Sequence, residues 1–160
     1  MILKLNEDYN IALLSPEDES GIKFCSNYLT AAWHIPAEQA EKRIRSYAAN
    51  QENSFCVICK DGSIPIGLMA LFSRTGLETD GTYEPWAAGL YVLEEFRRKG
   101  LGSRILERLL SEAKARGYSR VHLATDQTQL KDWYRSLGWR PAGRAFDETH
   151  EYEVFAFDIN

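Results

Sequence analysis

The chain has 160 residues, of which 44% are hydrophobic and 26% are charged, and its formal net charge is −4. This length fits one domain spanning residues 1–160, and the composition excludes disordered and collagen-like chains. The negative balance argues against a nucleic-acid partner, and the longest apolar run, Ile66–Phe72, is too short to cross a membrane. Because acidic residues follow from Glu7 onward, no secretory signal is expected, and we predict a soluble cytoplasmic protein.

Three cysteines bear on metal binding and on the redox compartment: Cys25, Cys56 and Cys59. An odd, low number disfavours a disulfide scaffold. Cys56 and Cys59 have C-x-x-C spacing, but a structural zinc site needs four ligands, and no second pair is present. We therefore interpret both as core residues of a buried strand and expect no metal.

The first elements in chain order are a strand and two helices. The apolar run Tyr9–Leu14 predicts a strand. Ser15 and the proline and acids that follow it predict the start of a helix reaching about Trp33. Pro36 then opens a second helix that ends near Asn50, with apolar residues at helical spacing.

A hairpin and a loop come next. The runs Phe55–Cys59 and Ile64–Phe72 flank Asp61 and Gly62, and Asp-Gly is a strong tight-turn signal. The stretch Arg74–Pro85 contains two glycines, acidic residues and one proline, and it is predicted to be a loop.

The second half alternates strands with helices. Trp86–Leu93 predicts a central strand, and Gly89 inside it indicates a bulge or a close backbone approach. An apolar stripe from Ser103 predicts a helix closed by Gly117. The remaining predicted elements are a strand, a short helix and two strands: Val121–Thr125, Leu130–Leu137, Trp139–Phe146 and Tyr152–Ile159. The whole predicts a mixed α/β (α+β) fold with helices packed on a sheet.

The segment Arg97–Gly102, with sequence RRKGLG, joins the central strand to the helix after it. The start of a helix offers unpaired backbone N–H groups and a partial positive charge. Glycines at 100 and 102 let a ligand approach these groups, and three cationic side chains stand beside them. The segment therefore predicts a diphosphate site, although its spacing matches neither a Walker A loop nor a dinucleotide fingerprint.

Two motifs at this spacing resemble a known family. Arg97–Gly102 has the form R-x-x-G-x-G, and Tyr134–Trp139 has the form Y-x-x-x-G-W after a helix and a strand. In these motifs and in element order the chain resembles the GCN5-related N-acetyltransferase (GNAT) superfamily. The resemblance implies a GNAT fold, with a mixed, mostly antiparallel central sheet of about seven strands flanked by about four helices. It also implies transfer of an acetyl group from acetyl-CoA to a primary amine, by direct attack in a ternary complex.

The resemblance further assigns roles to residues of this sequence. Tyr134 is implied as the general acid that protonates the leaving thiolate, and Gln127 stands where many members place an asparagine near the cofactor. The resemblance also implies two sets of contacts with acetyl-CoA. The pantetheine arm is contacted by Leu90, Tyr91 and Val92. The pyrophosphate is contacted by Arg97, Arg98, Lys99, Gly100, Leu101, Gly102 and Ser103.

The general base departs from the family pattern. Trp86 occupies the position where many members have a glutamate on this strand, and an indole cannot accept the proton. Glu84 lies two residues earlier, and it is the first candidate because a strand that extends to it would place it on the same face as Trp86. His122, on the neighbouring predicted strand, is an alternative because its pKa suits proton transfer near neutral pH.

The acceptor stays open at this point. Within the enzyme class it is a small amine, such as a polyamine, an amino acid or an aminoglycoside, or a peptide or protein amine. Trp33 and His34 lie between the first two helices, where the family usually builds the acceptor site. The alternative function is a non-catalytic acetyl-CoA-binding regulatory module. A homodimer is compatible with the sequence, because exposed edges of the C-terminal strands could pair between two copies.

Overall fold

The computed structural model describes residues 9–50 and 53–159, so the N-terminal residues examined for a signal lie outside it. Within this part of the chain the strands form an eight-stranded sheet in the order β1-β2-β3-β5-β6-β8-β7-β4, together with four helices. The sheet is mixed and mostly antiparallel, with β5 and β6 parallel. The predicted fold class is confirmed. No described helix has the length and apolar character that a membrane span requires.

The described residues divide into two compact units. The first contains the residues up to Ala70 and Gly89–Leu109, and the second contains Leu71–Ala88 and the residues from Leu110 onward. Strand β5 (Trp86–Val92) and helix α3 (Leu101–Ala115) each contribute residues to both units.

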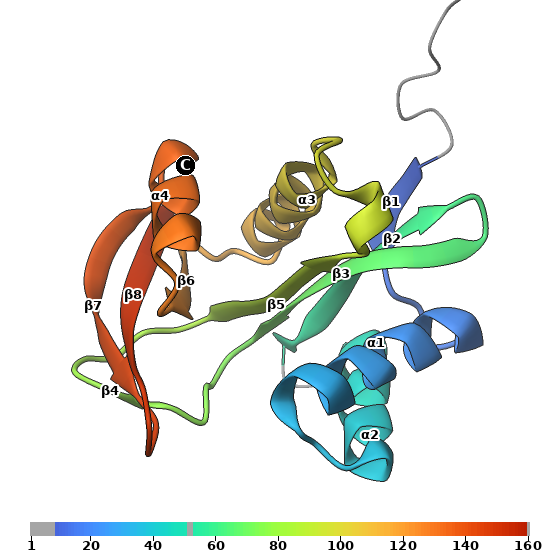
Figure 1. The fold of residues 1–160 in the computed structure, drawn as a ribbon, viewed down its shortest axis with the longest axis horizontal. Helices are drawn as coiled ribbons and strands as arrows, with labels where there is room; N and C mark the ends of the chain where they lie inside the picture. Colours follow the sequence, from blue (N-terminus) through green and yellow to red (C-terminus); the bar gives the residue numbers. More distant parts are fainter. Residues whose placement is uncertain (1–8, 51–52, 160) are drawn as a thin grey trace, which may run out of the picture. The chain divides into compact units, whose positions relative to one another are not determined.

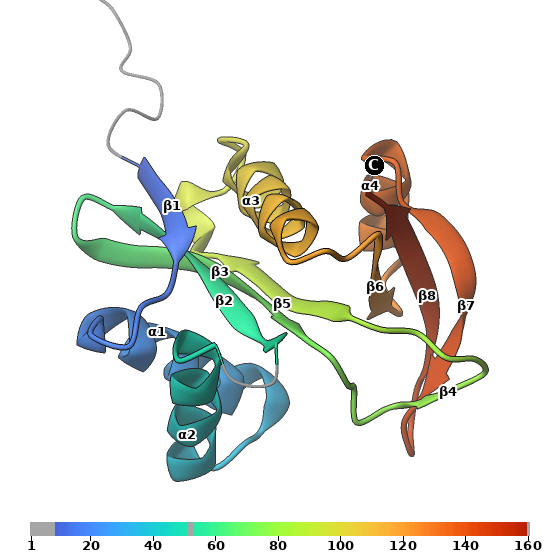
Figure 2. The same ribbon diagram turned by 180° about the vertical axis from the view of Figure 1, so that it is seen from behind.

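In the first unit a sheet is covered by helices on both faces. Its elements are β1 (Tyr9–Leu13), α1 (Glu19–Trp33), α2 (Ala37–Ala48), β2 (Phe55–Asp61), most of β3 (Ile64–Phe72), and its parts of β5 and α3. Helices α1 and α2 lie on one face of the strands and α3 lies on the other (Figure 1). Figure 2 shows the same layers from behind. The tight turn predicted at Asp61 and Gly62 is present, with a φ of 61° at Gly62.

The three cysteines belong to this unit, and all are buried and free. The Sγ atoms of Cys25 and Cys56 are 3.8 Å apart. The hydrogen bond with Cys56, together with burial, raises the pKa of Cys25, and burial raises the pKa of Cys59 to about 11. Their burial fits the interpretation of Cys56 and Cys59 as core residues of a strand.

Helix α1 begins later than its sequence signals indicate. The predicted cap was Ser15, but the helix starts at Glu19 and Asp18 is its N-cap. Asp18 Oδ1 accepts a hydrogen bond from the backbone N of Gly21 at 3.0 Å, and Asp18 Oδ2 lies 2.7 Å from Nζ of Lys60 on β2. Asp18 therefore both caps the helix and forms an ion pair with Lys60, a residue distant in sequence. Ser15 lies outside the helix.

We predict that Asp18→Ala lowers the free energy of unfolding by about 1–2 kcal/mol at pH 7, because the cap and the ion pair are lost together. Burial opposes ionisation of Asp18, but the bonds from Lys60 and from the Gly21 N–H outweigh it, and its pKa lies below the usual value. A lowered native pKa stabilises the fold above the unfolded-state pKa, and this contribution is lost as the pH falls through the native value. Denaturant unfolding measured between pH 7 and pH 3 should therefore show that the free energy of unfolding falls less with pH in the variant than in the parent.

The control for this change is Asp132→Ala, which removes an exposed carboxylate paired with Arg135 three residues away at 3.1 Å. An exposed ion pair of this kind contributes little to stability. The free energy of unfolding of Asp132→Ala should therefore stay within about 0.5 kcal/mol of the parent value. Equal losses in the two variants would contradict the assignment of Asp18 as the cap.

The second unit is built from strands β4 (Glu78–Thr79), β6 (Arg120–Thr125), β7 (Arg140–Phe146) and β8 (Glu151–Asp158), with helix α4 (Thr128–Ser136). Strand β4 lies in the segment that the sequence predicted to be a loop. The strand was not predicted because two residues are too few to show an alternating pattern. It pairs with Ala145 and Phe146 at the sheet edge. Helix α4 packs on β8, where the guanidinium of Arg135 lies 5.3 Å from the centre of the Phe155 ring.

Candidate active site

The loop predicted to bind a diphosphate joins β5 to α3 in the first unit. Leu93 N donates to Ile66 O at 2.8 Å, which fixes the end of β5 against β3. A single 3₁₀ turn, Glu94–Phe96, follows. The first helical hydrogen bond of α3 then runs from Arg104 N to Gly100 O at 3.2 Å. The N–H groups of the first helical turn, beginning at Leu101, therefore precede the helical ladder and are available to an anion.

The backbone of this loop has the shape that an anion site needs. Arg98 and Gly100 have φ values of 64° and 77°, in the left-handed region. A Cβ built at Gly100 would meet nothing within 4 Å, so open space lies against the backbone at the start of the helix. Left-handed residues in a turn of this kind can direct successive backbone N–H groups toward one side, where they form an anion-binding concavity. The residues present thus fit a pyrophosphate group.

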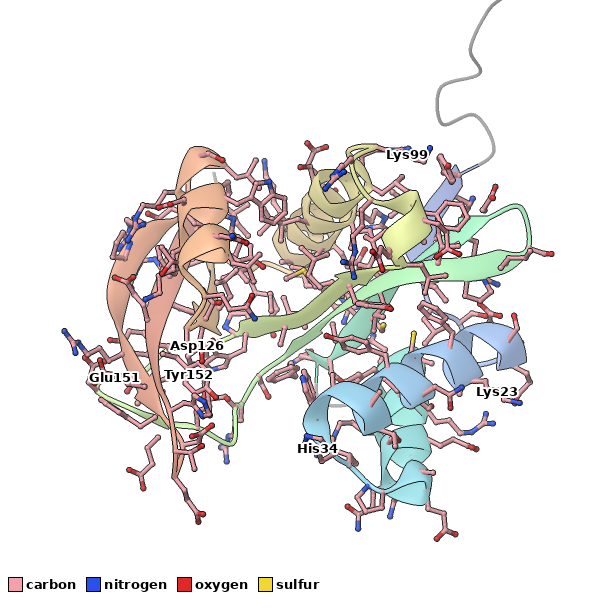
Figure 3. All side chains as sticks on the ribbon, viewed as in Figure 1. Lys23, His34, Lys99, Asp126, Glu151 and Tyr152 are labelled. Carbon is pink, nitrogen blue, oxygen red and sulfur yellow. The ribbon has the colours of Figure 1, made fainter. Side chains whose placement is uncertain are left out.

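The three cationic side chains of the loop differ in what they contact. Arg97 Nε donates to Val92 O at 2.8 Å, and its guanidinium lies 5.6 Å from the centre of the Tyr91 ring. It therefore braces the end of β5. Arg98 and Lys99 are exposed, and Lys99 lies in the loop that leads into α3 (Figure 3). Arg98 and Lys99 thus add exposed positive charge to the loop, beside the Arg97 guanidinium that is bonded to β5.

Strand β5 contacts α1 around its glycine. Gly89 has a φ of 76°, which agrees with the irregularity predicted there. A Cβ at Gly89 would lie 3.5 Å from Tyr28 and 3.6 Å from Trp33, both on α1. Tyr28 stacks on Tyr91 with ring centres 4.8 Å apart, and burial raises its pKa. Of the two candidate acceptor residues, Trp33 thus contacts β5, whereas His34 ends α1 in a left-handed conformation (Figure 3).

The second unit contains Tyr134 and Gln127. Tyr134 lies on α4, is 5% exposed, and packs between Trp133 and Trp139 with ring centres 5.1 Å and 5.8 Å away. Gln127 immediately precedes α4 and is exposed, with no side-chain capping bond. Tyr134 is therefore enclosed by aromatic packing, whereas the Gln127 side chain is exposed to solvent.

The two candidate bases line one pocket of about 450 Å³ in the second unit. Glu84 is exposed and precedes β5, which begins at Trp86, so the strand does not extend to Glu84 as the sequence analysis expected. His122 is 6% exposed, with Nδ1 3.3 Å from Pro85 O. Burial lowers the pKa of His122, which keeps the imidazole neutral at pH 7. Tyr134 is not among the residues that line this pocket.

Two further pocket residues escaped the sequence analysis. Arg120 and Arg140 also line it, and both make ion pairs with Asp158. They begin different strands, and in the sequence each resembles an ordinary exposed residue at the end of a strand. Only the pairing of β6, β7 and β8 brings them together. Among residues 9–50 and 53–159, no group of three or more histidine, cysteine or acidic side chains is arranged to hold a metal ion.

Known proteins with a similar sequence or fold place the chain in a family. No curated protein matches the chain. The model of the acetyltransferase (GNAT) family matches residues 22–139, which include the two motifs at Arg97–Gly102 and Tyr134–Trp139. The chain belongs to this acetyltransferase family. The resemblance indicated by the motifs is therefore confirmed.

Solved structures show that the GNAT fold extends over nearly the whole chain. Aminoglycoside 6′-acetyltransferase type Ii is 18% identical, covers 94% of this chain and 97% of its own, and has a TM-score of 0.73. An aminoglycoside 6′-N-acetyltransferase complexed with coenzyme A is 16% identical, with coverages of 94% and 97% and a TM-score of 0.74. A third structure, from Salmonella typhimurium with its cofactor acetyl-CoA, is 16% identical, with coverages of 96% and 95% and a TM-score of 0.71.

Proposed function

We propose that this GNAT protein transfers the acetyl group of acetyl-CoA to a primary amine by direct attack in a ternary complex. The observation that carries the proposal is the Arg97–Gly102 loop, with its left-handed backbone and its open space at Gly100 before α3. Family membership and the coenzyme A and acetyl-CoA complexes of proteins with this fold support it.

The loop supplies the contacts that hold the pyrophosphate. The N–H groups of Leu101, Gly102 and Ser103 donate to its oxygens, and Arg98 and Lys99 balance its charge. Arg97 acts differently, because its bond to Val92 O keeps the loop aligned with β5.

Strand β5 supplies the contacts for the pantetheine arm. Among the described residues, the ladder between β5 and β6 consists of the single pair Trp86–His122. Leu90, Tyr91 and Val92 lie beyond that pair, so one edge of their backbone can hydrogen-bond to the amides of the arm.

The chemistry needs one proton acceptor and one proton donor. The neutral amine nitrogen forms a bond to the thioester carbonyl carbon, and the carbon–sulfur bond breaks. Glu84 accepts the proton lost by the nitrogen, and the phenol of Tyr134 gives a proton to the departing sulfur. The products are an amide and the free thiol, and both side chains return to their starting state by exchange with solvent. His122 is the alternative acceptor, because it is neutral and lines the same pocket as Glu84.

The first test is thermal unfolding of the full chain with acetyl-CoA, CoA, NAD and ATP in parallel. A ligand present at a hundredfold excess over its Kd stabilises the native state by about 2.7 kcal/mol, which raises the Tm by several degrees at this size. We expect a shift with acetyl-CoA and CoA and none with NAD. The absence of a shift with either coenzyme at millimolar concentration would remove the cofactor assignment and the mechanism with it.

A further inference from the structure

The pocket of about 450 Å³ in the second unit carries charges of both signs. Its base is formed by one face of the sheet. In the strand register, Ala156 on β8 lies opposite His122 on β6 and opposite Arg140 on β7. Directly opposed residues project to the same face, so these side chains stand together. Ala156 is small and buried, and it lines the pocket together with His122 and Arg140.

Asp158 holds two arginines at this pocket. Its Oδ1 accepts from Arg120 Nε at 2.6 Å, and its Oδ2 accepts from Arg140 Nε at 3.1 Å. Arg140 Nη2 reaches Asp158 Oδ1 at 3.4 Å. No other partner exists among the described residues for either guanidinium, so both terminal nitrogens of Arg120 and Nη1 of Arg140 remain available. Two positive charges thus share one carboxylate, and the terminal N–H groups suit a second, external one.

The charges of the pocket explain why a purely anionic ligand is not the best match. Glu84 lines it together with the two arginines, and Glu84 has no ion-pair partner among the described residues. Its carboxylate repels a polyanion and attracts an ammonium group. Two further titratable groups line the pocket, and both are neutral at pH 7: burial lowers the pKa of His122, and the hydrogen bond to Asp80 raises the pKa of Tyr83. Charged side chains of both signs therefore line one pocket.

We propose that this pocket binds a small zwitterion, with its carboxylate on Arg120 and Arg140 and its ammonium group at Glu84. An α-amino acid or a short peptide end has this chemistry, and the volume lies in the range of small-molecule sites. The step to catalysis rests on the proposed function: the amine placed at the candidate base Glu84 is then the acetyl acceptor. An aminoglycoside, which carries several ammonium groups, fits two arginines poorly.

The test compares three compounds that share one ring. L-phenylalanine carries both charges, 2-phenylethylamine carries only the amine, and 3-phenylpropionate carries only the carboxylate. Calorimetry or NMR titration on the full chain should show L-phenylalanine binding about tenfold more tightly than either analogue, because each lacks one charged contact. Where acetylation is measured, kcat/KM should show the same preference for L-phenylalanine over 2-phenylethylamine.

Single variants locate the binding. Arg120→Gln and Arg140→Gln should each reduce the preference for L-phenylalanine over 2-phenylethylamine about tenfold, and each leaves Asp158 one arginine partner. Arg144→Gln is the matched control, because Arg144 is an exposed β7 arginine paired with Glu151 at 2.6 Å and does not line the pocket. Thermal unfolding verifies that each variant folds.

Each outcome decides the proposal. Equal binding of L-phenylalanine and 2-phenylethylamine, no binding of any compound at millimolar concentration, or an equal loss in Arg144→Gln would overturn it. These results are independent of the coenzyme test. A CoA shift without a carboxylate preference leaves the proposed function standing and removes the zwitterion site. Binding of L-phenylalanine without a CoA shift keeps the site and removes its role in acetyl transfer.

Discussion

Tyr134→Phe is expected to lower kcat by about 100- to 10,000-fold, the usual contribution of a positioned proton donor. The change removes only the phenolic O–H. The ring that packs against Trp133 and Trp139, with centres 5.1 Å and 5.8 Å away, is retained. Affinity for acetyl-CoA should therefore stay within about twofold of the parent. Thiol release with the best acceptor of an amine panel gives kcat, and calorimetry gives the affinity.

The control is Tyr47→Phe, which removes a hydroxyl from a similarly buried tyrosine on α2, 9% exposed. It is expected to keep the parent kcat, because no role in the reaction is assigned to it. An unchanged kcat in Tyr134→Phe would remove the assignment of Tyr134 as donor. Turnover that is absent in the parent with every amine, while CoA still binds, would instead favour the non-catalytic binding module.

The parts of the fold that follow from local sequence are the helices, the strands and the loop before α3. Gly100 is an example: its left-handed φ of 77° ends the loop, and the helix begins at the next residue. The sequence placed this start at Ser103, two residues late, because Leu101 and Gly102 look like loop residues when read for helical periodicity. The local sequence pattern therefore predicts that an anion site is present better than it predicts the residue at which α3 begins.

The parts that did not follow from local sequence depend on contacts between distant segments. Asp18 caps α1 while it is paired to Lys60 on β2, and no window around residue 18 contains that lysine. In the same way, Arg120 and Arg140 meet at Asp158 only through strand register. The sequence predicted Glu84 and His122 as candidate bases, but the two arginines that line the same pocket could not be assigned to a site before the sheet order was known.

The second prediction of large effect concerns the loop itself. Gly100→Val is expected to weaken CoA binding by about 10- to 100-fold, which corresponds to the loss of one or two charge-assisted hydrogen bonds. Two causes act together. A β-branched side chain disfavours the φ of 77°, and its methyl groups occupy the space that is open at Gly100. Calorimetric titration with CoA measures the affinity, and denaturant unfolding measures the accompanying loss of stability.

Gly117→Val separates the two causes. Gly117 follows α3, has a φ of 91°, and would also meet nothing within 4 Å if given a Cβ. The same substitution there introduces comparable backbone strain of about 1–2 kcal/mol without touching the proposed site. Both variants should therefore lose similar stability, while only Gly100→Val loses affinity for CoA. Parent-like CoA binding by Gly100→Val would show that the start of α3 is not where the pyrophosphate is held, because a blocked site cannot keep its ligand.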